Sequence, residues 1–335
     1  MTGGGRRLST DDTLLLRALR GQPTQQVPFW EVWFAMSGLA KHLLGHPLDG
    51  IADEVAFARR MGWEYVRIPV PSRRIGATSA IASDGTSHYV QGGRVDLQEL
   101  RSQPEPDWSL ALAEAHRRVA VARAEGMVTI AYVPWAFHAV TTALGLEVLS
   151  LLLYDDPPYI AALFDWVEEG VRAAIREVII PAGIDVVLVD GDCAFKNGLM
   201  VNPRIFRELV FDRTRQTVAA LREADTIYTF HSDGKADELL PLLIELGFSA
   251  FHGVEAAAND LGDIKLRFGR DITLIGNMDV VFLTHATVAD VRACTEKMLT
   301  IGMEGGRYVA ACNTSPLDYI PYQNYLAMVD VIHNF

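Results

Sequence analysis

The sequence is poor in cysteine and contains no run of basic residues. Its 335 residues include only three cysteines, Cys193, Cys294 and Cys312, which are far apart and form no CxxC pair. Such scattered cysteines argue against a disulfide framework and favour a reduced, cytoplasmic protein. The 42 acidic side chains outnumber the 30 basic ones, and the net charge is -12. Without a basic cluster to follow phosphates or anionic lipids, neither nucleic acid nor a membrane is an expected partner.

Long apolar runs and glycine-rich nucleotide motifs are also missing. The least charged stretch, residues 126–146, contains Pro134, His138 and Gly145, so we interpret it as a buried strand followed by a helix and not as a membrane span. Residues 1–10 lack the apolar segment of a signal peptide, which predicts a flexible leader. No G-x-G-x-x-G follows a predicted strand, so we expect no nucleotide cofactor.

What the sequence does contain is a repeated order of helix, glycine and short apolar strand. The predicted strands are residues 28–34, 65–70, 129–133, 185–189, 226–230, 250–254, 273–275 and 308–311. Between them lie helices with clear end signals, such as residues 202–210 and 237–246. Eight strands in this order predict a single domain over residues 1–335, a (β/α)8 barrel with an N-terminal extension. An open doubly wound sheet is the alternative.

Two segments interrupt this order and are predicted to be insertions at the barrel mouth. Residues 72–107 are polar and rich in Gly and Ser, which favours a small hairpin. Residues 133–185 leave room for two helices, around 139–154 and 158–178. Insertions of this kind commonly form walls or lids over a barrel mouth.

Polar side chains follow most of the predicted strands. They are Asp190, Asp192, His231, Asp233, Glu255, Asn277, Asp279, Cys312 and Asn313. In a barrel the carboxyl ends of all strands meet on one face, where catalytic groups lie. We therefore predict one polar site. Its catalytic groups are Asp190, His231, Asp233 and Glu255, and its substrate contacts are Asp192, Asn277, Asp279 and Asn313.

Each of these residues also has a purely structural interpretation. His231 can cap a strand, and Asp233 precedes a glycine in an ordinary turn signal. Residues 190–192 can form a turn, and Cys312 can be a small buried apolar side chain. Glu255 is harder to explain in this way. An unpaired carboxylate at the end of an apolar strand is costly to bury, so it calls for a partner, a metal or a substrate.

Aromatic residues gather near the ends of the early strands. Trp30, Trp33, Trp135 and Phe137 form either an apolar wall for a ring-shaped substrate or ordinary core. Glu31 lies between the first two and is a further candidate for substrate contact. The sequence leaves open a homodimer, for which this Trp-rich segment and residues 334–335 are candidate surfaces.

Taken together, these residues resemble the uroporphyrinogen-decarboxylase-like superfamily. The likeness rests on Val27-Pro-Phe-Trp30, Asp190-Gly-Asp192, Asn202-Pro203, His231-Ser-Asp-Gly234, Glu255, Ile275-Gly-Asn-Met-Asp279, Gly305-Gly306 and Tyr322-Gln-Asn-Tyr325. It covers nearly the whole chain and implies a (β/α)8 barrel. True uroporphyrinogen decarboxylases carry an arginine-bearing segment after the first strand, which pairs with the acidic arms of a tetrapyrrole. Residues 30–37 contain no arginine, which argues against that reaction.

The other branch of the superfamily consists of methyltransferases that exchange a methyl group with a corrinoid protein. Members that act on thiols bind zinc through His-x-Cys and a late cysteine. Here Asp233 replaces the first of those cysteines, and the resemblance implies a less thiophilic metal set of His231, Asp233, Glu255 and Cys312. The His-Ser-Asp-Gly version looks more like members associated with demethylation of methoxylated aromatic or similar compounds.

The resemblance therefore implies a methyltransferase or demethylase that acts on a small methylated substrate. A corrinoid protein or another methyl acceptor would dock at the barrel mouth, with zinc as the candidate metal. One alternative is a cofactor-free decarboxylase in which Asp190 or Asp233 guides the proton. Its candidate carboxylate anchors are Arg67, Arg73, Arg74 and Lys196. A non-catalytic binding protein is a further alternative, disfavoured because so many charged groups follow the strands.

Overall fold

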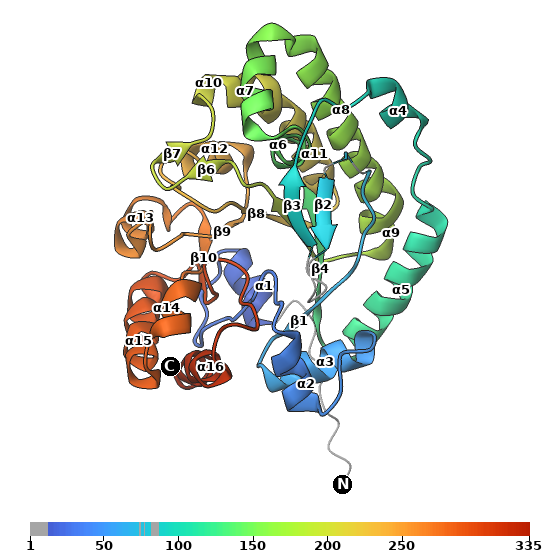
Figure 1. Ribbon diagram of the computed structural model, residues 1–335. Helices are drawn as coiled ribbons and strands as arrows, with labels where there is room; N and C mark the ends of the chain where they lie inside the picture. Colours follow the sequence, from blue (N-terminus) through green and yellow to red (C-terminus); the bar gives the residue numbers. More distant parts are fainter. Residues whose placement is uncertain (1–12, 74, 77, 82–86) are drawn as a thin grey trace.

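A computed structural model describes residues 13–335, except residues 74, 77 and 82–86, and shows a curled parallel sheet with helices around it (Figure 1). The predicted leader, residues 1–10, lies outside the described residues. Seven strands form the sheet in the order β1-β4-β5-β8-β9-β10-β11. They are β1 (Tyr65–Arg67), β4 (Val128–Pro134), β5 (Val186–Asp190), β8 (Ile227–His231), β9 (Ala250–His252), β10 (Thr273–Ile275) and β11 (Tyr308–Val309).

The central strands are apolar because both of their faces are covered. In β4 and β5 nearly every residue is buried, and valine is the commonest side chain. Parallel strands that are covered on both faces need such continuous apolar runs. All neighbouring strands of this sheet are parallel, so their carboxyl ends lie along one edge.

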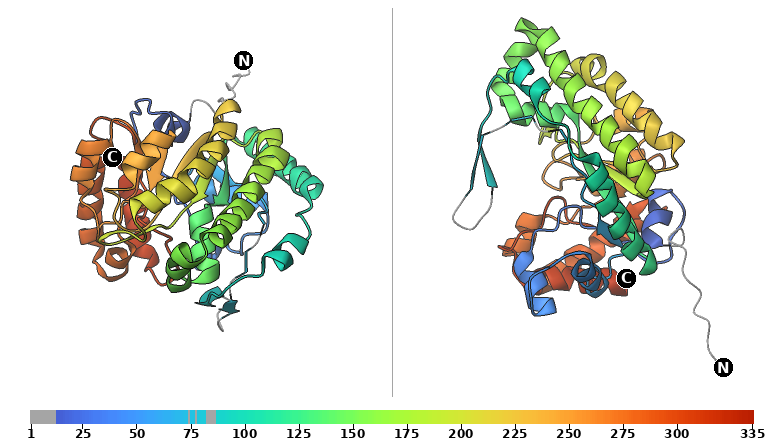
Figure 2. Two further views of the ribbon diagram at one scale, coloured as in Figure 1. Left: turned by 90° about the horizontal axis from the view of Figure 1, so that it is seen from above. Right: turned by 90° about the vertical axis from the view of Figure 1, so that its right-hand side faces the viewer.

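Helices connect the strands and lie outside the curled sheet (Figure 2). They are α1 (Leu14–Leu19), α2 (Ser37–Leu44), α3 (Ile51–Arg60), α4 (Leu97–Ser102), α5 (Trp108–Ala124), α6 (Ala136–Leu144), α7 (Leu146–Asp155), α8 (Pro157–Ala174), α9 (Ile180–Ala182), α10 (Pro203–Phe206), α11 (Asp212–Glu223), α12 (Leu240–Leu246), α13 (Leu261–Phe268), α14 (Val280–His285), α15 (Val288–Met303) and α16 (Tyr322–Asn334). Two π-helical turns, Ile175–Ile179 and Arg207–Phe211, follow α8 and α10. Two small hairpins, β2 (Thr78–Ile81) with β3 (Ser87–Gln91) and β6 (Ala194–Phe195) with β7 (Gly198–Leu199), complete the described elements.

Several local predictions are confirmed. Asn202 caps α10 by accepting a hydrogen bond from the Arg204 backbone N–H, and Pro203 occupies the first helical turn. Gly247 ends α12 in the left-handed conformation. The hairpin predicted within residues 72–107 is β2–β3, although residues 89–93, expected at its centre, lie in and after its second strand; it projects away from the helices in the right-hand view of Figure 2. The first predicted helix after β4 is divided at Gly145 into α6 and α7.

Among the described residues, no single helix has the length and hydropathy of a membrane span. Only α6 and α7 taken together reach them, and this pair is bent by 105°.

The first predicted strand along the chain, residues 28–34, does not form a regular strand. It makes one isolated bridge, Phe29 to Ala310 beside β11. On its other side, within the described residues, no backbone hydrogen bond joins residues 28–34 to β1. Instead, the Tyr65 hydroxyl donates to the Glu31 carbonyl over 2.6 Å, and the Tyr132 hydroxyl donates to the Val32 carbonyl. We call this gap between residues 28–34 and β1 the seam.

Side-chain hydroxyls explain why the seam stays open. A strand ladder needs backbone N–H groups opposite these carbonyls, and a tyrosine side chain holds the two backbones further apart than a ladder does. Pro28 also lacks an N–H group of its own. The seam therefore leaves space between the segment and the sheet.

We expect Gly253→Ala to destabilise the protein by roughly 2 kcal/mol or more. Gly253 follows β9 with φ of 123°, and a Cβ there would lie 2.2 Å from the Ser232 carbonyl oxygen. Thermal melting measures the effect. Gly93→Ala is the matched control, because a Cβ at Gly93 meets no atom within 4 Å. Equal melting temperatures for the two variants would contradict this reading of the β9 edge.

Candidate active site

Neighbouring strand ends bring several of the predicted polar residues together. β5 and β8 are paired in register, with Asp190 opposite His231. In the turn after each strand, Asp192 and Asp233 extend the same edge. The distance from His231 Nε2 is 3.4 Å to Asp192 Oδ1 and 3.9 Å to Asp233 Oδ1. These four residues, predicted to follow neighbouring strands, therefore lie close together at one edge of the sheet.

A fifth residue, His138 of α6, joins them from the other side. Its Nδ1 lies 3.7 Å from Asp192 Oδ2, so the two oxygens of Asp192 face two different histidines. We call His138, Asp190, Asp192, His231 and Asp233 the rim cluster. Within it, two sets of three residues place their ligand atoms within 4.8 Å of one another: Asp192, His231 and Asp233, and His138, Asp190 and Asp192. Imidazole nitrogens and carboxylate oxygens of this kind suit zinc.

His252, at the end of β9, contacts the rim cluster through His231. The two Nδ1 atoms are 2.7 Å apart, and His252 Nε2 lies 3.1 Å from the Cys312 carbonyl oxygen. Both rings are buried, with 3 % of His231 and 1 % of His252 exposed. Sequence analysis missed His252, although it stands in the predicted strand 250–254, in register with His231.

These contacts determine which nitrogens carry protons. A carbonyl oxygen only accepts, so His252 Nε2–H must donate to Cys312. Burial and the neighbouring His231 lower the pKa of His252 well below its usual value, so its ring is neutral. His252 Nδ1 is then the acceptor, and His231 Nδ1–H donates to it. When the His231 ring is neutral, its unprotonated nitrogen is consequently Nε2, which faces Asp192 and Asp233; when the ring is protonated, Nε2–H donates to Asp192.

The carboxyl groups of the rim cluster differ in acidity. Burial tends to raise the pKa of Asp192, but its hydrogen bond with His231 and the charges of His231 and His138 hold it at about 2. Asp233 has a pKa of about 6, because burial and the charges of Asp192 and Glu255 outweigh the effect of His231. Burial also raises the pKa of Asp190. Asp192 is thus the permanent anion, and Asp233 is the group nearest to neutrality.

The charge on His231 reflects the same neighbours. Burial lowers the pKa of His231, but the hydrogen bond with Asp192 and the nearby carboxylates outweigh it, so the net shift is upward. Asp233 Oδ1 is buried and has no hydrogen-bond partner, although His231 Nε2 lies 3.9 Å away. A buried oxygen in this state calls for a donor or a cation.

Glu255 lies near Asp233 and Cys312 contacts His252, but neither residue joins a three-residue set. Glu255 Oε2 accepts from the Gly234 backbone N–H over 3.0 Å, and its Oε1 is 3.7 Å from Lys196 Nζ. Cys312 directs its thiol toward Glu31. The four-residue metal set implied by the resemblance is therefore not assembled here, whereas Asp192, predicted only as a substrate contact, belongs to both sets.

The remaining predicted polar contacts hold loops. Asn277 Nδ2 donates to the Val254 carbonyl over 3.0 Å, and Asn313 Oδ1 accepts from the Val280 N–H over 3.2 Å. Asp279 caps α14 by accepting from the first backbone N–H groups. These hydrogen bonds shape the edge of the sheet beyond β10.

Most of the predicted aromatic residues belong to the core. Trp135 and Phe137 are buried and pack against Phe206, and Trp30 is fully buried against Tyr65. Trp33 is different, because it contacts both a cavity and the rim cluster. Its ring centroid lies 4.5 Å from that of His231.

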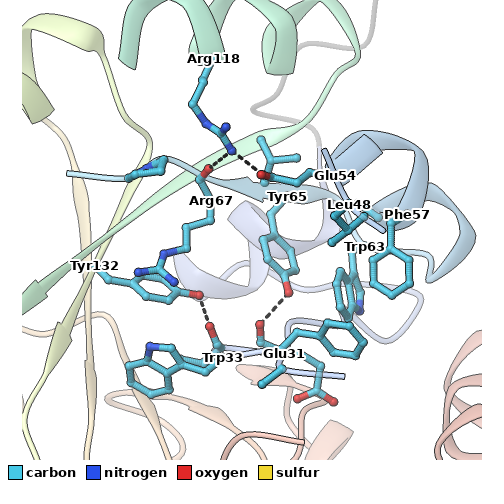
Figure 3. A pocket seen from close by; sticks show the side chains of 16 residues that line it. Glu31, Trp33, Leu48, Glu54, Phe57, Trp63, Tyr65, Arg67, Arg118 and Tyr132 are labelled. Carbon is cyan, nitrogen blue, oxygen red and sulfur yellow. Dashed lines mark hydrogen bonds and ion pairs between the residues drawn. The ribbon is translucent and has the colours of Figure 1, made fainter. Parts of the chain in front are cut away.

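The cavity lies at the seam and has a volume of about 620 Å³ (Figure 3). We call it the seam cavity. Its lining is largely aromatic and includes Trp33, Phe34, Phe57, Trp63, Tyr65, Arg67 and Tyr132. Trp33 and Tyr132 contact each other with centroids 5.5 Å apart, so the wall of the cavity continues to His231. This volume is typical of small-molecule sites.

Glu31 holds a buried carboxyl group directed away from the seam. Its oxygens accept from the Cys312 backbone N–H and from the Tyr325 hydroxyl, both over 3.1 Å. Only 1 % of Glu31 is exposed. Burial, only partly offset by these hydrogen bonds, raises its pKa to about 7. Its side chain thus ties the early segment to β11 and α16.

A polar cluster at the carboxyl edge of a curled parallel sheet is the arrangement of α/β-barrel enzymes. Residues 65–335 match the family model described as uroporphyrinogen decarboxylase (URO-D). Because this match covers most of the chain, the protein belongs to the uroporphyrinogen decarboxylase family. No curated protein sequence matches the chain.

Solved structures agree on the fold. A methyltransferase from Methanosarcina mazei is similar with a TM-score of 0.75 and 17 % identity, covering 98 % of this chain and 99 % of that one. The apo form of 3-keto-D-glucoside 4-epimerase from E. coli has a TM-score of 0.50 and 10 % identity, covering 93 % and 100 %. At these identities the likeness establishes the fold alone.

Glu31→Gln should stabilise the protein at alkaline pH. The carboxyl has a pKa of about 7 when folded, against an ordinary value of 4.5. The folded state therefore binds the proton more tightly, and wild-type stability falls as the pH rises from about 4.5 to 7. The loss amounts to about 3 kcal/mol, which the neutral amide does not suffer. Urea unfolding at pH 5 and pH 8 measures it.

The control for this prediction is Glu114→Gln, which neutralises an exposed carboxylate. The pKa of Glu114 is lowered by its hydrogen bond with Arg117, so no gain toward alkaline pH is expected there. If the difference between wild type and Glu31→Gln stayed constant from pH 5 to pH 8, Glu31 would not be a buried neutral acid.

His252→Phe should change which ring nitrogen of His231 carries the proton. In the wild type at alkaline pH, we expect His231 to carry its proton on Nδ1, because His252 Nδ1 accepts it. Without that acceptor, His231 should shift to the Nε2–H form. Nitrogen-15 NMR of histidine-labelled protein distinguishes the two forms, and His231→Ala assigns the signal. An exposed-residue control, His116→Phe, should leave it unchanged; an Nε2–H signal for His231 in the wild type would refute the assignment.

Proposed function

We propose that this protein removes a methyl group from a small methylated substrate and passes it to an external acceptor, such as a corrinoid protein. The observation that carries the proposal is the contact between Trp33, which lines the seam cavity, and His231 of the rim cluster. A ring-shaped substrate against the aromatic wall would then present its methylated atom to His231, Asp192 and Asp233. The methyltransferase from Methanosarcina mazei supports the choice of reaction within the family.

The proposed step breaks the bond between the methyl carbon and the oxygen of the substrate. The acceptor supplies the electron pair that forms the new bond to carbon, and the pair of the broken bond stays on the oxygen. That oxygen must be stabilised as it departs, by a proton or by a cation. The rim cluster has residues suited to either role.

For a metal, the fitting set is Asp192, His231 and Asp233. In the neutral ring of His231, Nε2 is unprotonated and faces the two aspartates. Asp233 Oδ1, which has no hydrogen-bond partner, is available as a further metal ligand. A bound zinc ion would act as a Lewis acid on the leaving oxygen. His252 would hold His231 in the ligating orientation by the hydrogen bond at its other nitrogen.

The alternative is a cofactor-free decarboxylase of a small acid. One observation favours it: Arg67 reaches the seam cavity without an ion-pair partner among the described residues, and a carboxylate would fit there. The two reactions differ in their products. A decarboxylase releases carbon dioxide without any methyl acceptor, whereas a demethylase requires one.

The test uses 4-methoxybenzoate labelled with carbon-13 in its methyl group, and reduced cob(I)alamin as the acceptor. We expect labelled methylcobalamin with the wild-type protein, measured by its absorbance and by NMR. Asp233→Asn should lower the rate on the order of 100-fold, as the loss of an acid or a ligand does. Metal analysis of the wild type and His231→Ala then separates the two roles, because only metal ligation predicts bound zinc that the substitution removes.

Asp155→Asn is the matched control, because Asp155 is an exposed aspartate at the end of α7 and belongs to neither three-residue set. It should transfer the methyl group at the wild-type rate. Carbon dioxide release with no transferred methyl group would replace the proposal with the decarboxylase. An unchanged rate in Asp233→Asn would remove the rim cluster from the reaction.

A further inference from the structure

Arg67 is one of two arginines that line the seam cavity. It is the last residue of β1, and its side chain lies on the same face as Tyr65, whose hydroxyl crosses the seam to Glu31. Figure 3 shows the Arg67 side chain extending into the cavity above Tyr132. The guanidinium carbon lies 4.5 Å from the Tyr132 ring centroid. The Arg67 side chain lines the seam cavity and is exposed to solvent.

Within the part of the chain that the structure describes, no carboxylate forms an ion pair with Arg67. The other cation of the lining, Arg118, is already bound to Glu54 and to the Arg67 carbonyl. Arg73, also named from the sequence, pairs with two glutamates outside this cavity. Arg74 lies outside the described residues. Arg67 therefore differs from these cations, because it faces an open, aromatic space and no carboxylate of the described residues pairs with it.

The chemistry of Arg67 selects the kind of ligand. Its planar guanidinium stacks on the Tyr132 ring, and this leaves the N–H groups along its edge free for a ligand. Two parallel N–H groups on that edge match the two oxygens of a carboxylate. The aromatic residues beside it, Trp33 and Tyr132, offer faces to a flat ring.

The charges near the cavity also orient such a ligand. Behind Trp33, the rim cluster holds three aspartates against two histidines, so it receives an anionic group less well than Arg67 does. Arg67 and Asp190 are close enough for the charge of Arg67 to lower the pKa of Asp190, so both fields act on one small molecule. A ligand with a carboxylate at one end is thereby turned so that its other end meets the rim cluster.

We infer that the substrate is a small aromatic carboxylate, anchored by its carboxylate on Arg67 and by its ring on Trp33 and Tyr132. Its methylated atom lies at the opposite end, toward His231. This inference rests on the proposed function for the identity of that end. The carboxylate anchor itself depends only on Arg67 and the cavity.

Binding without a methyl acceptor tests the anchor separately from the reaction. The probes are 4-methoxybenzoate and its neutral analogue 4-methoxybenzamide, measured by isothermal titration calorimetry. The wild type should bind the acid at least 10-fold more tightly than the amide. Arg67→Gln should weaken binding of the acid by about 10- to 100-fold and leave the amide unchanged, as expected for a charged hydrogen-bonded pair. Arg67→Lys should restore part of the affinity.

Arg117→Gln, which removes the same charge from the exposed face of α5, should leave both affinities unchanged. Equal binding of acid and amide to the wild type, equal loss of both in Arg67→Gln, or no binding of either probe would overturn the inference. If Arg67→Gln fails to fold, the acid-to-amide ratio in Arg67→Lys decides instead, and an unchanged ratio counts against the anchor.

The two proposals fail in different ways. If the acid binds through Arg67 but no methyl group reaches cobalamin, the proposed function fails and the anchor stands. If methyl transfer proceeds as fast from the amide as from the acid, the function stands and the anchor fails.

Discussion

The row of polar residues across β5, β8 and β9 is the constraint on which the site depends. Parallel pairing puts Asp190 opposite His231 and His231 opposite His252, so one register controls three adjacent positions. A slip of one residue would turn these side chains to the other face of the sheet. Because the strands are buried on both faces, such a slip would also expose apolar side chains, and the core therefore holds the site in place.

The hydrogen bond between His231 and His252 connects this register to chemistry. It assigns one nitrogen of His231 to the protein interior and leaves the other for the aspartates. His252 is fixed in turn by the carbonyl of Cys312, which follows β11. The orientation of the His231 ring is thus set through His252 by a backbone carbonyl two strands further along the sheet.

At the seam, the described residues form no backbone hydrogen bonds between the segment and β1, and a cavity lies there instead. A regular eighth strand would close the ring and fill the room between residues 28–34 and β1. Tyr65 and Tyr132 satisfy the carbonyls there by their hydroxyl groups, and the aromatic cavity occupies the resulting gap. The buried carboxyl of Glu31 holds the same segment on its other side, through Cys312 and Tyr325. The irregular segment 28–34, the seam cavity and the position of Arg67 in it all follow from the missing backbone ladder between residues 28–34 and β1.

The sequence by itself determined the order of the strands, the caps at Asn202 and Gly247 and the meeting of Asp190, Asp192, His231 and Asp233, because these follow from apolar periodicity and from the common direction of parallel strands. Only the tertiary structure decided that His252 and His138 approach this group, that Cys312 turns toward Glu31, and that Trp33 lines the cavity while Trp135 is core. Those outcomes depend on which side chains face each other across strands and helices distant in sequence. No local pattern encodes that geometry, since the direction of a buried side chain is set by the packing of its neighbours.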